Sequence, residues 1–208
     1  MTINHKNVVI IDYQMGNVAS VKKAFEKIGA KIKISHFEKD IKNAEYLILP
    51  GVGAFEEGMK NLTKQGLINL LQKQVVEKGV PLLGICLGMQ LLAETGYEFG
   101  THKGLGWIKG ETVKLKAPNL PHVGWNNIKI RKKSIFQNIP DDNFYFVHSY
   151  IFKPKNKSIT VATCSYGETF TAALQKDNIF ATQFHPEKSQ LAGLRVLENF
   201  LNFKSNYA

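Results

Sequence analysis

The sequence predicts an α/β fold: an open, mostly parallel sheet flanked by helices, with an antiparallel β-rich portion in the second half of the chain. Two features predict this class. In the first half, short apolar runs alternate with amphipathic segments, as in β-α-β units that place helices on both faces of a parallel sheet. In the second half, short strand-like segments follow one another with turn residues between them, which is typical of antiparallel pairing.

The first half begins with residues 8–12, a β-branched run that suits a strand buried on both faces. Asn17 can cap the helix that follows, and Gly29 can end it. Further strands are expected at residues 31–35, 46–49 and 80–85, and further helices at residues 67–78 and 87–94.

Strands dominate the second half of the chain. They are expected at residues 104–116, 123–130, 144–152, 159–165, 170–175 and 179–184. Residues 191–203 have the apolar periodicity of an amphipathic helix. A length of 208 residues fits one domain, so residues 1–208 are predicted to form a single domain.

The composition argues against several classes of function. The net charge is +10, but all except two of the 27 basic residues are lysines, spread along the chain. Nucleic-acid recognition favours arginine, whose guanidinium makes paired hydrogen bonds, so we expect a solvated lysine surface and no nucleic-acid partner. The two cysteines make no disulfide framework and fit a reducing cytosol, which predicts a cytoplasmic protein. No segment approaches the ~18 apolar residues of a membrane span.

The run Gly84-Ile85-Cys86-Leu87-Gly88 has the form of a nucleophile elbow, a sharp turn between a buried strand and a helix. Cysteine stands where hydrolases place serine. The two glycines allow the tight backbone path, and the helix N-terminus favours a thiolate. The backbone N–H of Leu87 would point toward a developing oxyanion. Cys164 lies within a predicted strand, and we interpret it as structural.

A cysteine nucleophile needs a base, and His185 is the best candidate among six histidines. It lies at the end of an apolar strand, two residues before Glu187. In an extended segment, residues two apart face the same way, and Pro186 favours an extended path. Glu187 is therefore expected to orient the imidazole of His185.

Neither a metal nor a cofactor is predicted. No pair of histidines or cysteines has the close spacing of a zinc site. Residues 50–53, with the sequence PGVG, lack both the full dinucleotide-binding glycine pattern and the lysine of a phosphate-binding loop. We interpret them as a turn after the third strand whose backbone N–H groups face the same site.

Together these segments resemble the class I, triad-type glutamine amidotransferases. Residues 84–90 match the nucleophile motif of this family, residues 184–189 its histidine–glutamate motif, and residues 50–53 its oxyanion loop. The resemblance implies that a cysteine attacks the side-chain amide of L-glutamine. A γ-glutamyl thioester would form, ammonia would leave, and water would release glutamate.

A narrower resemblance is to the glutaminase subunits of imidazole glycerol phosphate synthases, which act in histidine biosynthesis. It rests on residues 11–13, 16–17, 50–55, 121–126 and 145–150. It implies a heterodimer with a (β/α)8-barrel cyclase subunit, which receives the ammonia. The chain departs from the pattern at Gln14, where the family commonly has glycine in the partner-facing loop.

The resemblance also implies roles for individual residues. The catalytic triad would be Cys86, His185 and Glu187. The backbone of Val52, Gly53 and Leu87 would form the oxyanion site; Gly51, Gln90, Glu98, Ser149 and Tyr150 would hold the substrate; and Asn17, Tyr145 and Lys188 would face the partner.

Three alternatives stay open at this point. A paralogous amidotransferase subunit that supplies ammonia to a surface-sugar precursor would have the same motifs. A stand-alone cysteine hydrolase would need no partner, and a basic nucleic-acid-binding module would bind in a steeply salt-dependent way. The glycines around Val52 also suggest a switch: if its N–H rests turned away from the oxyanion, the isolated subunit would hydrolyse glutamine very slowly until the cyclase docks.

Overall fold

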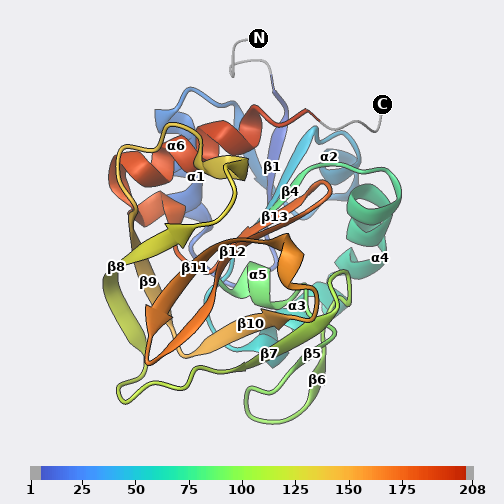
Figure 1. Ribbon diagram of the computed structural model, residues 1–208. Coiled ribbons are helices and arrows are strands. Elements are labelled where there is room, and N and C mark those ends of the chain that lie inside the picture. The colour runs from blue at the N-terminus through green and yellow to red at the C-terminus, as the bar shows by residue number, and fades with distance from the viewer. Residues whose placement is uncertain (1–5, 205–208) are drawn as a thin grey trace.

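The computed structural model describes residues 6–204, and its centre is a nine-stranded mixed sheet (Figure 1). The strand order is β2-β1-β3-β4-β13-β12-β11-β8-β9. Four parallel pairings join β2 through β13, and four antiparallel pairings continue from β13 to β9. The predicted α/β class is confirmed, with antiparallel pairing taking a larger share of the main sheet than the sequence pattern indicated.

The first half of the chain builds the parallel part of the sheet and most of the helices. Its strands are β1 (Val8–Ile11), β2 (Ile32–Ser35), β3 (Tyr46–Leu49) and β4 (Leu82–Ile85). Its helices are α1 (Val18–Lys27), α2 (Glu38–Lys42), α3 (Phe55–Lys64), α4 (Leu67–Leu71) with a π-helical continuation over Gln72–Glu77, and α5 (Leu87–Gln90).

The second half is mainly antiparallel. Its strands are β5 (Thr95–Gly96), β6 (His102–Lys103), β7 (Gly110–Lys114), β8 (His122–Ile130), β9 (Asn143–His148), β10 (Tyr150–Pro154), β11 (Thr160–Tyr166), β12 (Glu168–Lys176) and β13 (Ile179–Thr182). Short 3-10 turns lie at Ser134–Phe136, Lys157–Ile159 and Pro186–Lys188, and α6 (Gln190–Leu201) follows.

Helices cover both faces of the parallel strands. Successive side chains of a strand point to opposite faces, so a strand that is apolar throughout needs a covering layer on each side. On β1, one face packs against α1 and α6, and the other packs against α2, α3 and α4 (Figure 1). The first face joins Val8, Ile10, Val21, Phe25, Val196 and Phe200; the second joins Val9, Ile11, Ile41, Leu62 and Leu71. This two-sided burial explains the uninterrupted apolar run of β1.

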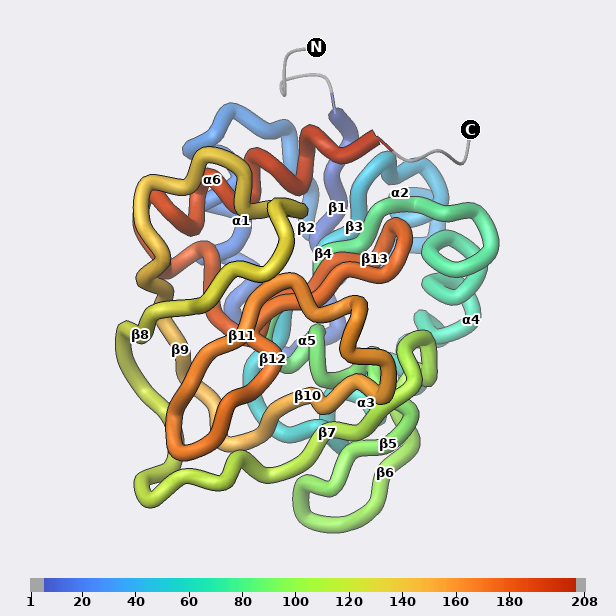
Figure 2. Tube along the Cα trace, in the orientation of Figure 1, coloured from blue at the N-terminus to red at the C-terminus, as the bar shows by residue number. Residues whose placement is uncertain are grey.

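A second sheet of four strands, in the order β10-β7-β5-β6, lies beside the main sheet. The sequence pattern predicts one strand over residues 144–152, but the chain leaves the main sheet at Ser149 (Figure 2). Before this residue β9 pairs with β8, and after it β10 pairs with β7. The apolar pattern runs through the break because both strands bury side chains.

Several predicted boundaries are wrong for local reasons. Helices α2 and α3 have no counterpart among the predicted elements. The helix expected at residues 87–94 has regular α-helical form only over Leu87–Gln90, and the strand expected at 104–116 is regular only over Gly110–Lys114. Gly104 packs against backbone, where a Cβ would lie 2.2 Å from the carbonyl oxygen of Ala93, so this segment is a close-packed loop.

Candidate active site

Cys86 occupies a strained turn between β4 and α5. Its φ of 53° and ψ of −106° are unusual for a residue with a side chain. A Cβ at Gly88 would lie 1.7 Å from the carbonyl oxygen of Leu49, and one at Gly84 would lie 2.9 Å from that of Gly88. Glycine is therefore required on both sides of the cysteine, as the nucleophile-elbow interpretation predicts.

His185 and Glu187 form a buried pair beside the cysteine. Nδ1 of His185 donates to Oε1 of Glu187 at 2.7 Å, and both side chains are inaccessible to solvent. The expected extended path ends at His185, because Pro186–Lys188 forms a 3-10 turn that brings the carboxylate back to the ring. Nε2 of His185 is buried and makes no hydrogen bond within the described residues, so this nitrogen is free to exchange a proton.

The electrostatics of the pair favour a charged histidine. Burial alone lowers the pKa of His185, but its electrostatic interactions with Cys86 and Glu187 raise it to about 10. Burial raises the pKa of Glu187, but its hydrogen bond and ion pair with His185 lower it below its usual range. The surroundings of His185 thus favour the protonated imidazole.

Asn17 joins this pair from the loop after β1. The sequence pattern predicts it as a side-chain cap of α1, and this is wrong: it adopts a φ of 62° and makes no cap hydrogen bond. Its Nδ2 instead donates to Oε1 of Glu187 at 2.5 Å and lies 3.4 Å from Nδ1 of His185. Asn17 therefore connects the predicted partner-facing loop directly to the pair formed by His185 and Glu187.

A cavity of about 320 Å³ opens over the Cys86 side chain. Most of the residues predicted to bind substrate or oxyanion line it, together with others from β9 and from the 3-10 turn over Pro186–Lys188. Its lining comprises Val52, Gly53, Cys86, Leu87, Gln90, Glu98, Val147, His148, Ser149, Tyr150 and Lys188. Gly51 lies behind the lining, where a Cβ would come 3.1 Å from the Cβ of Leu87.

Gln90 and Glu98 present oxygen acceptors to this cavity. The amide nitrogen of Gln90 donates to the carbonyl oxygen of Tyr150 at 2.9 Å and to Oε1 of Gln183 at 3.2 Å. Both hydrogens of that amide are therefore used, and its oxygen is the group that Gln90 can offer to a ligand. Glu98 accepts a hydrogen bond from the backbone N–H of Phe55 at 2.8 Å, which fixes its carboxylate at the cavity. This pair suits an ammonium group.

Of the three residues predicted for the oxyanion site, Val52 and Leu87 have their backbone donors occupied in this conformation. The N–H of Val52 donates to the carbonyl oxygen of Met15 at 3.0 Å, and the N–H of Leu87 donates to the carbonyl oxygen of Gly51 at 3.3 Å. The Gly51 carbonyl and the Val52 N–H belong to one peptide group. A single rotation of this peptide would therefore release the Leu87 donor and redirect the Val52 donor.

An exposed aromatic surface lies next to the triad on β8 and β9. The rings of Trp125 and Tyr145 pack edge to face at 6.0 Å, and Nζ of Lys188 lies 5.5 Å from the centre of the Tyr145 ring. Val123 and Trp125 are 56% and 46% exposed, which is high for large apolar side chains. The backbone of Tyr145 also accepts a hydrogen bond from the N–H of His185 at 2.9 Å, so this surface is continuous with the segment that carries His185.

The structure also places residues at the site to which sequence reasoning gave no role. Gln183 and Val147 contact the sulfur of Cys86, and His148 lies in the cavity wall. Burial, with the charges of His122 and His185, lowers the pKa of His148 to about 3. The register of β13 against β4 brings Gln183 to the cysteine, since it pairs Thr182 with Ile85, one residue before Gln183 and Cys86, and no local sequence pattern records this pairing.

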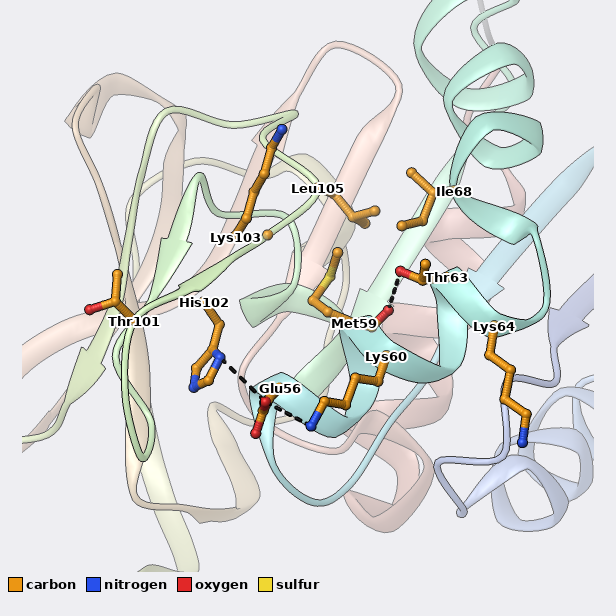
Figure 3. Close-up of a pocket in the computed structure, with 11 residues that line it drawn as sticks. Glu56, Met59, Lys60, Thr63, Lys64, Ile68, Thr101, His102, Lys103 and Leu105 are labelled. Carbon is orange, nitrogen blue, oxygen red and sulfur yellow. Dashed lines mark hydrogen bonds and ion pairs between the residues drawn. The ribbon is translucent and has the colours of Figure 1, made fainter.

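A larger cavity, of about 710 Å³, lies between α3 and the residues around β6 (Figure 3). It contains an ion pair between Lys60 and Glu56 at 2.7 Å, with His102 at 3.9 Å from the same carboxylate. No cysteine or serine lines it. Across residues 6–204, no group of three or more His, Cys, Asp or Glu side chains is arranged to hold a metal ion. None of the described helices has the length and apolarity needed to span a bilayer.

Comparisons with known proteins agree with this geometry. The family model for class-I glutamine amidotransferases matches residues 9–203. Imidazole glycerol phosphate synthase subunit HisH 1 of Campylobacter jejuni strain RM1221 is 52% identical over 199 residues, which cover 93% of this chain and 98% of that protein. Imidazole glycerol phosphate synthase subunit HisH of Aquifex aeolicus is 46% identical over 196 residues, covering 92% and 94%.

More distant solved structures have the same fold. A glutamine amidotransferase matches with a TM-score of 0.73 at 19% identity and covers 93% of this chain and 97% of that one. The PurLQS structure from Thermotoga maritima matches with a TM-score of 0.73 at 17% identity, covering 94% and 97%. At these identities, the likeness concerns the arrangement of strands and helices alone.

Proposed function

The chain belongs to the class-I glutamine amidotransferase family, and on this premise we propose that it is the glutaminase subunit of an imidazole glycerol phosphate synthase. It hydrolyses L-glutamine to glutamate and ammonia and passes the ammonia to a cyclase subunit. The observation that carries the proposal is the strained Cys86 elbow beside the buried pair of His185 and Glu187, at a cavity with acceptors for an ammonium group.

The reaction follows from the protonation states that the site favours. The Cys86 thiolate attacks the side-chain amide carbon of glutamine, and His185, protonated at Nε2, gives its proton to the departing ammonia. A γ-glutamyl thioester remains on Cys86. His185 then takes a proton from water, the resulting hydroxide attacks the thioester, and glutamate leaves as the thiolate is restored. Glu187 orients the ring and stabilises its charged form throughout.

Substrate selection uses the polar ends of the cavity. The amide oxygen of Gln90 and the carboxylate of Glu98 accept hydrogen bonds from the α-ammonium group of glutamine. The backbone of Ser149 and Tyr150 contacts the rest of the amino acid. A cavity of about 320 Å³ accommodates an amino acid, whereas a peptide chain would have to extend beyond it.

The oxyanion loop acts as the control point. With the Val52 N–H bonded to Met15 and the Leu87 N–H bonded to Gly51, no tetrahedral intermediate is stabilised. Docking of the cyclase favours the flipped peptide, in which both N–H groups face the oxyanion formed at Cys86. This coupling restricts glutamine hydrolysis to complexes that can use the ammonia.

The docking surface is the exposed face formed by Val123, Trp125, Tyr145 and Lys188, continued by Asn17. Its partner is a (β/α)8-barrel cyclase, with Lys188 pairing with an acidic group there. The relatives named as imidazole glycerol phosphate synthase subunits support this assembly. The protein acts in the cytoplasm, where the acceptor of this ammonia would be made.

A second candidate acceptor is a surface-sugar precursor, delivered to a paralogous synthase. Gln14 supports this second acceptor. The residue has a φ of 65° and lies in the partner-facing loop, at a position where the family commonly has glycine. Ammonia-transfer assays with each candidate synthase distinguish the two acceptors. A stand-alone hydrolase is less favoured because the oxyanion donors are bonded internally in the isolated chain.

The central experiment uses the complex with the cyclase. Cys86→Ala should abolish glutamine-dependent product formation and leave ammonia-dependent product formation intact, because the variant removes only the ammonia supply. Loss of both activities would instead mean that Cys86 holds the structure together. No glutamine turnover by the wild-type complex would refute the proposed function itself.

A further inference from the structure

Gln183 is a fully buried amide at the nucleophile, and the mechanism above gives it no role. Its side chain is inaccessible to solvent, and its Nε2 lies 3.6 Å from the sulfur of Cys86. Sheet pairing fixes this approach: β13 and β4 are parallel neighbours, and the N–H of Cys86 donates to the carbonyl oxygen of Thr182 at 2.8 Å. The two side chains leave adjacent strands at the same level.

The surrounding hydrogen bonds determine which end of the Gln183 amide faces the sulfur. The carbonyl oxygen of Tyr150 can only accept, so the group of Gln90 that contacts it is the NH2 donor. The same NH2 contacts Gln183, which must therefore present its oxygen to Gln90. The NH2 group of Gln183 is left facing Cys86.

A second donor, from His148, binds the same Tyr150 carbonyl oxygen. Nδ1 of His148 lies 3.0 Å from the same Tyr150 carbonyl oxygen and must donate to it, while its Nε2 lies 3.1 Å from Nδ1 of His122. His148 is thus held as a neutral ring that adds no charge beside the sulfur, in agreement with its pKa of about 3, lowered mainly by burial. A chain of fixed hydrogen bonds runs from His122 to the nucleophile.

The sulfur of Cys86 has two polar neighbours of opposite kind. The carbonyl oxygen of Val147, at 3.8 Å, can accept from the neutral thiol but repels a thiolate. The NH2 of Gln183 can donate to a thiolate, and a hydrogen bond to a charged acceptor is stronger than one to a neutral acceptor. Gln183 therefore favours the thiolate against the preference of Val147.

We propose that Gln183 is a catalytic residue that donates a hydrogen bond to the Cys86 thiolate, both before attack and when the thioester is cleaved. In the first step this bond stabilises the reactive form of the nucleophile. In the second it stabilises the sulfur as the carbon–sulfur bond breaks and negative charge returns to it. The proposal deepens the proposed function, because it names a further group at the same nucleophile.

The test measures the rate at which iodoacetamide alkylates Cys86 in the isolated protein at slightly acidic pH. This rate reports the fraction of Cys86 present as thiolate, because only the thiolate reacts. Cys164 does not interfere, because it is buried and burial raises its pKa to about 11. Gln183→Met removes the donor at similar volume, and we expect alkylation to slow about tenfold, the effect of one hydrogen bond to a charged group.

Two further variants make the test decisive. Gln183→Glu keeps the acceptor for Gln90 but places oxygen near the sulfur, so it should slow alkylation at least as much as Gln183→Met and remains informative if that variant folds poorly. Gln74→Met is the matched control, because Gln74 is a buried glutamine in the helical segment after α4. It should leave the alkylation rate unchanged, with thermal unfolding recorded for all three.

Alkylation of either Gln183 variant at the wild-type rate, in a folded protein, would overturn the inference. Its failure is distinguishable from that of the proposed function, because alkylation requires neither glutamine nor the cyclase. In the complex, Gln183→Met should lower kcat for glutamine about tenfold and leave ammonia-dependent turnover unchanged. A rise in KM at constant kcat would mean that Gln183 only shapes the substrate cavity.

Discussion

Docking of the cyclase should accelerate glutamine hydrolysis. The strength of the hydrogen bonds that hold the oxyanion loop determines by how much. In the isolated chain, flipping the peptide between Gly51 and Val52 breaks two bonds, from Val52 to Met15 at 3.0 Å and from Leu87 to Gly51 at 3.3 Å. At about 1 kcal/mol net for each, the closed loop is favoured by about 2 kcal/mol. About 3% of isolated molecules would then have the competent loop.

The closed loop itself contributes almost nothing to turnover, because each missing oxyanion donor reduces the rate by about 10²–10³. The rate of the isolated subunit is therefore set by the small competent fraction, and a partner that holds every molecule in the flipped conformation should raise kcat about 30-fold. KM should change less, since Gln90 and Glu98 are already in place.

The assay couples glutamate release to glutamate dehydrogenase, with and without a saturating amount of cyclase and its acceptor substrate. Cys86→Ala supplies the background rate. An isolated subunit that works within about threefold of the complex would refute the reasoning, because the two internal bonds would then cost almost nothing to break.

Three further outcomes follow from the site. Glu187→Gln should lower kcat by about 10⁴ and His185→Ala by about 10⁶, since Glu187 acts on the reaction only through the histidine that it orients; a larger loss at Glu187, measured in the complex, would contradict these roles. Asn17→Ala removes the 2.5 Å bond to Glu187 and should lower kcat about tenfold at unchanged KM, whereas a change in KM alone would place Asn17 outside the triad network. Gly88→Ala should destabilise the fold by about 3 kcal/mol in urea denaturation, because its Cβ would lie 1.7 Å from the Leu49 carbonyl oxygen; a wild-type midpoint would mean that the elbow can relax.

The sequence was informative where a local pattern determines the structure. The glycines around Cys86 require a sharp turn, and the turn lies where the motif predicts it. His185 and Glu187 are two residues apart, so their contact needs only a short turn, although that turn is 3-10 and not extended. The α/β class follows in the same way from local periodicity.

Features that depend on pairing between distant segments could not be read in this way. The side chain of Asn17 has a local use as a helix cap, but Glu187, 170 residues away, binds it instead. The bond from Val52 to Met15 joins two backbone groups, and no side-chain pattern records it. The register between β13 and β4 sets the contact of Gln183 with Cys86, and register between distant strands is not fixed by either strand alone.

At Ser149 the chain passes from the main sheet to the second sheet, so a single residue separates β9 from β10. On one side of this residue, β9 carries Tyr145 on the exposed aromatic face; on the other, β10 begins with Tyr150, whose carbonyl holds Gln90. Pressure from a docked protein on β9 would therefore reach the substrate cavity through one residue of backbone. In the proposed complex, a signal from the cyclase would cross this one connection, without a long series of contacts through the protein core.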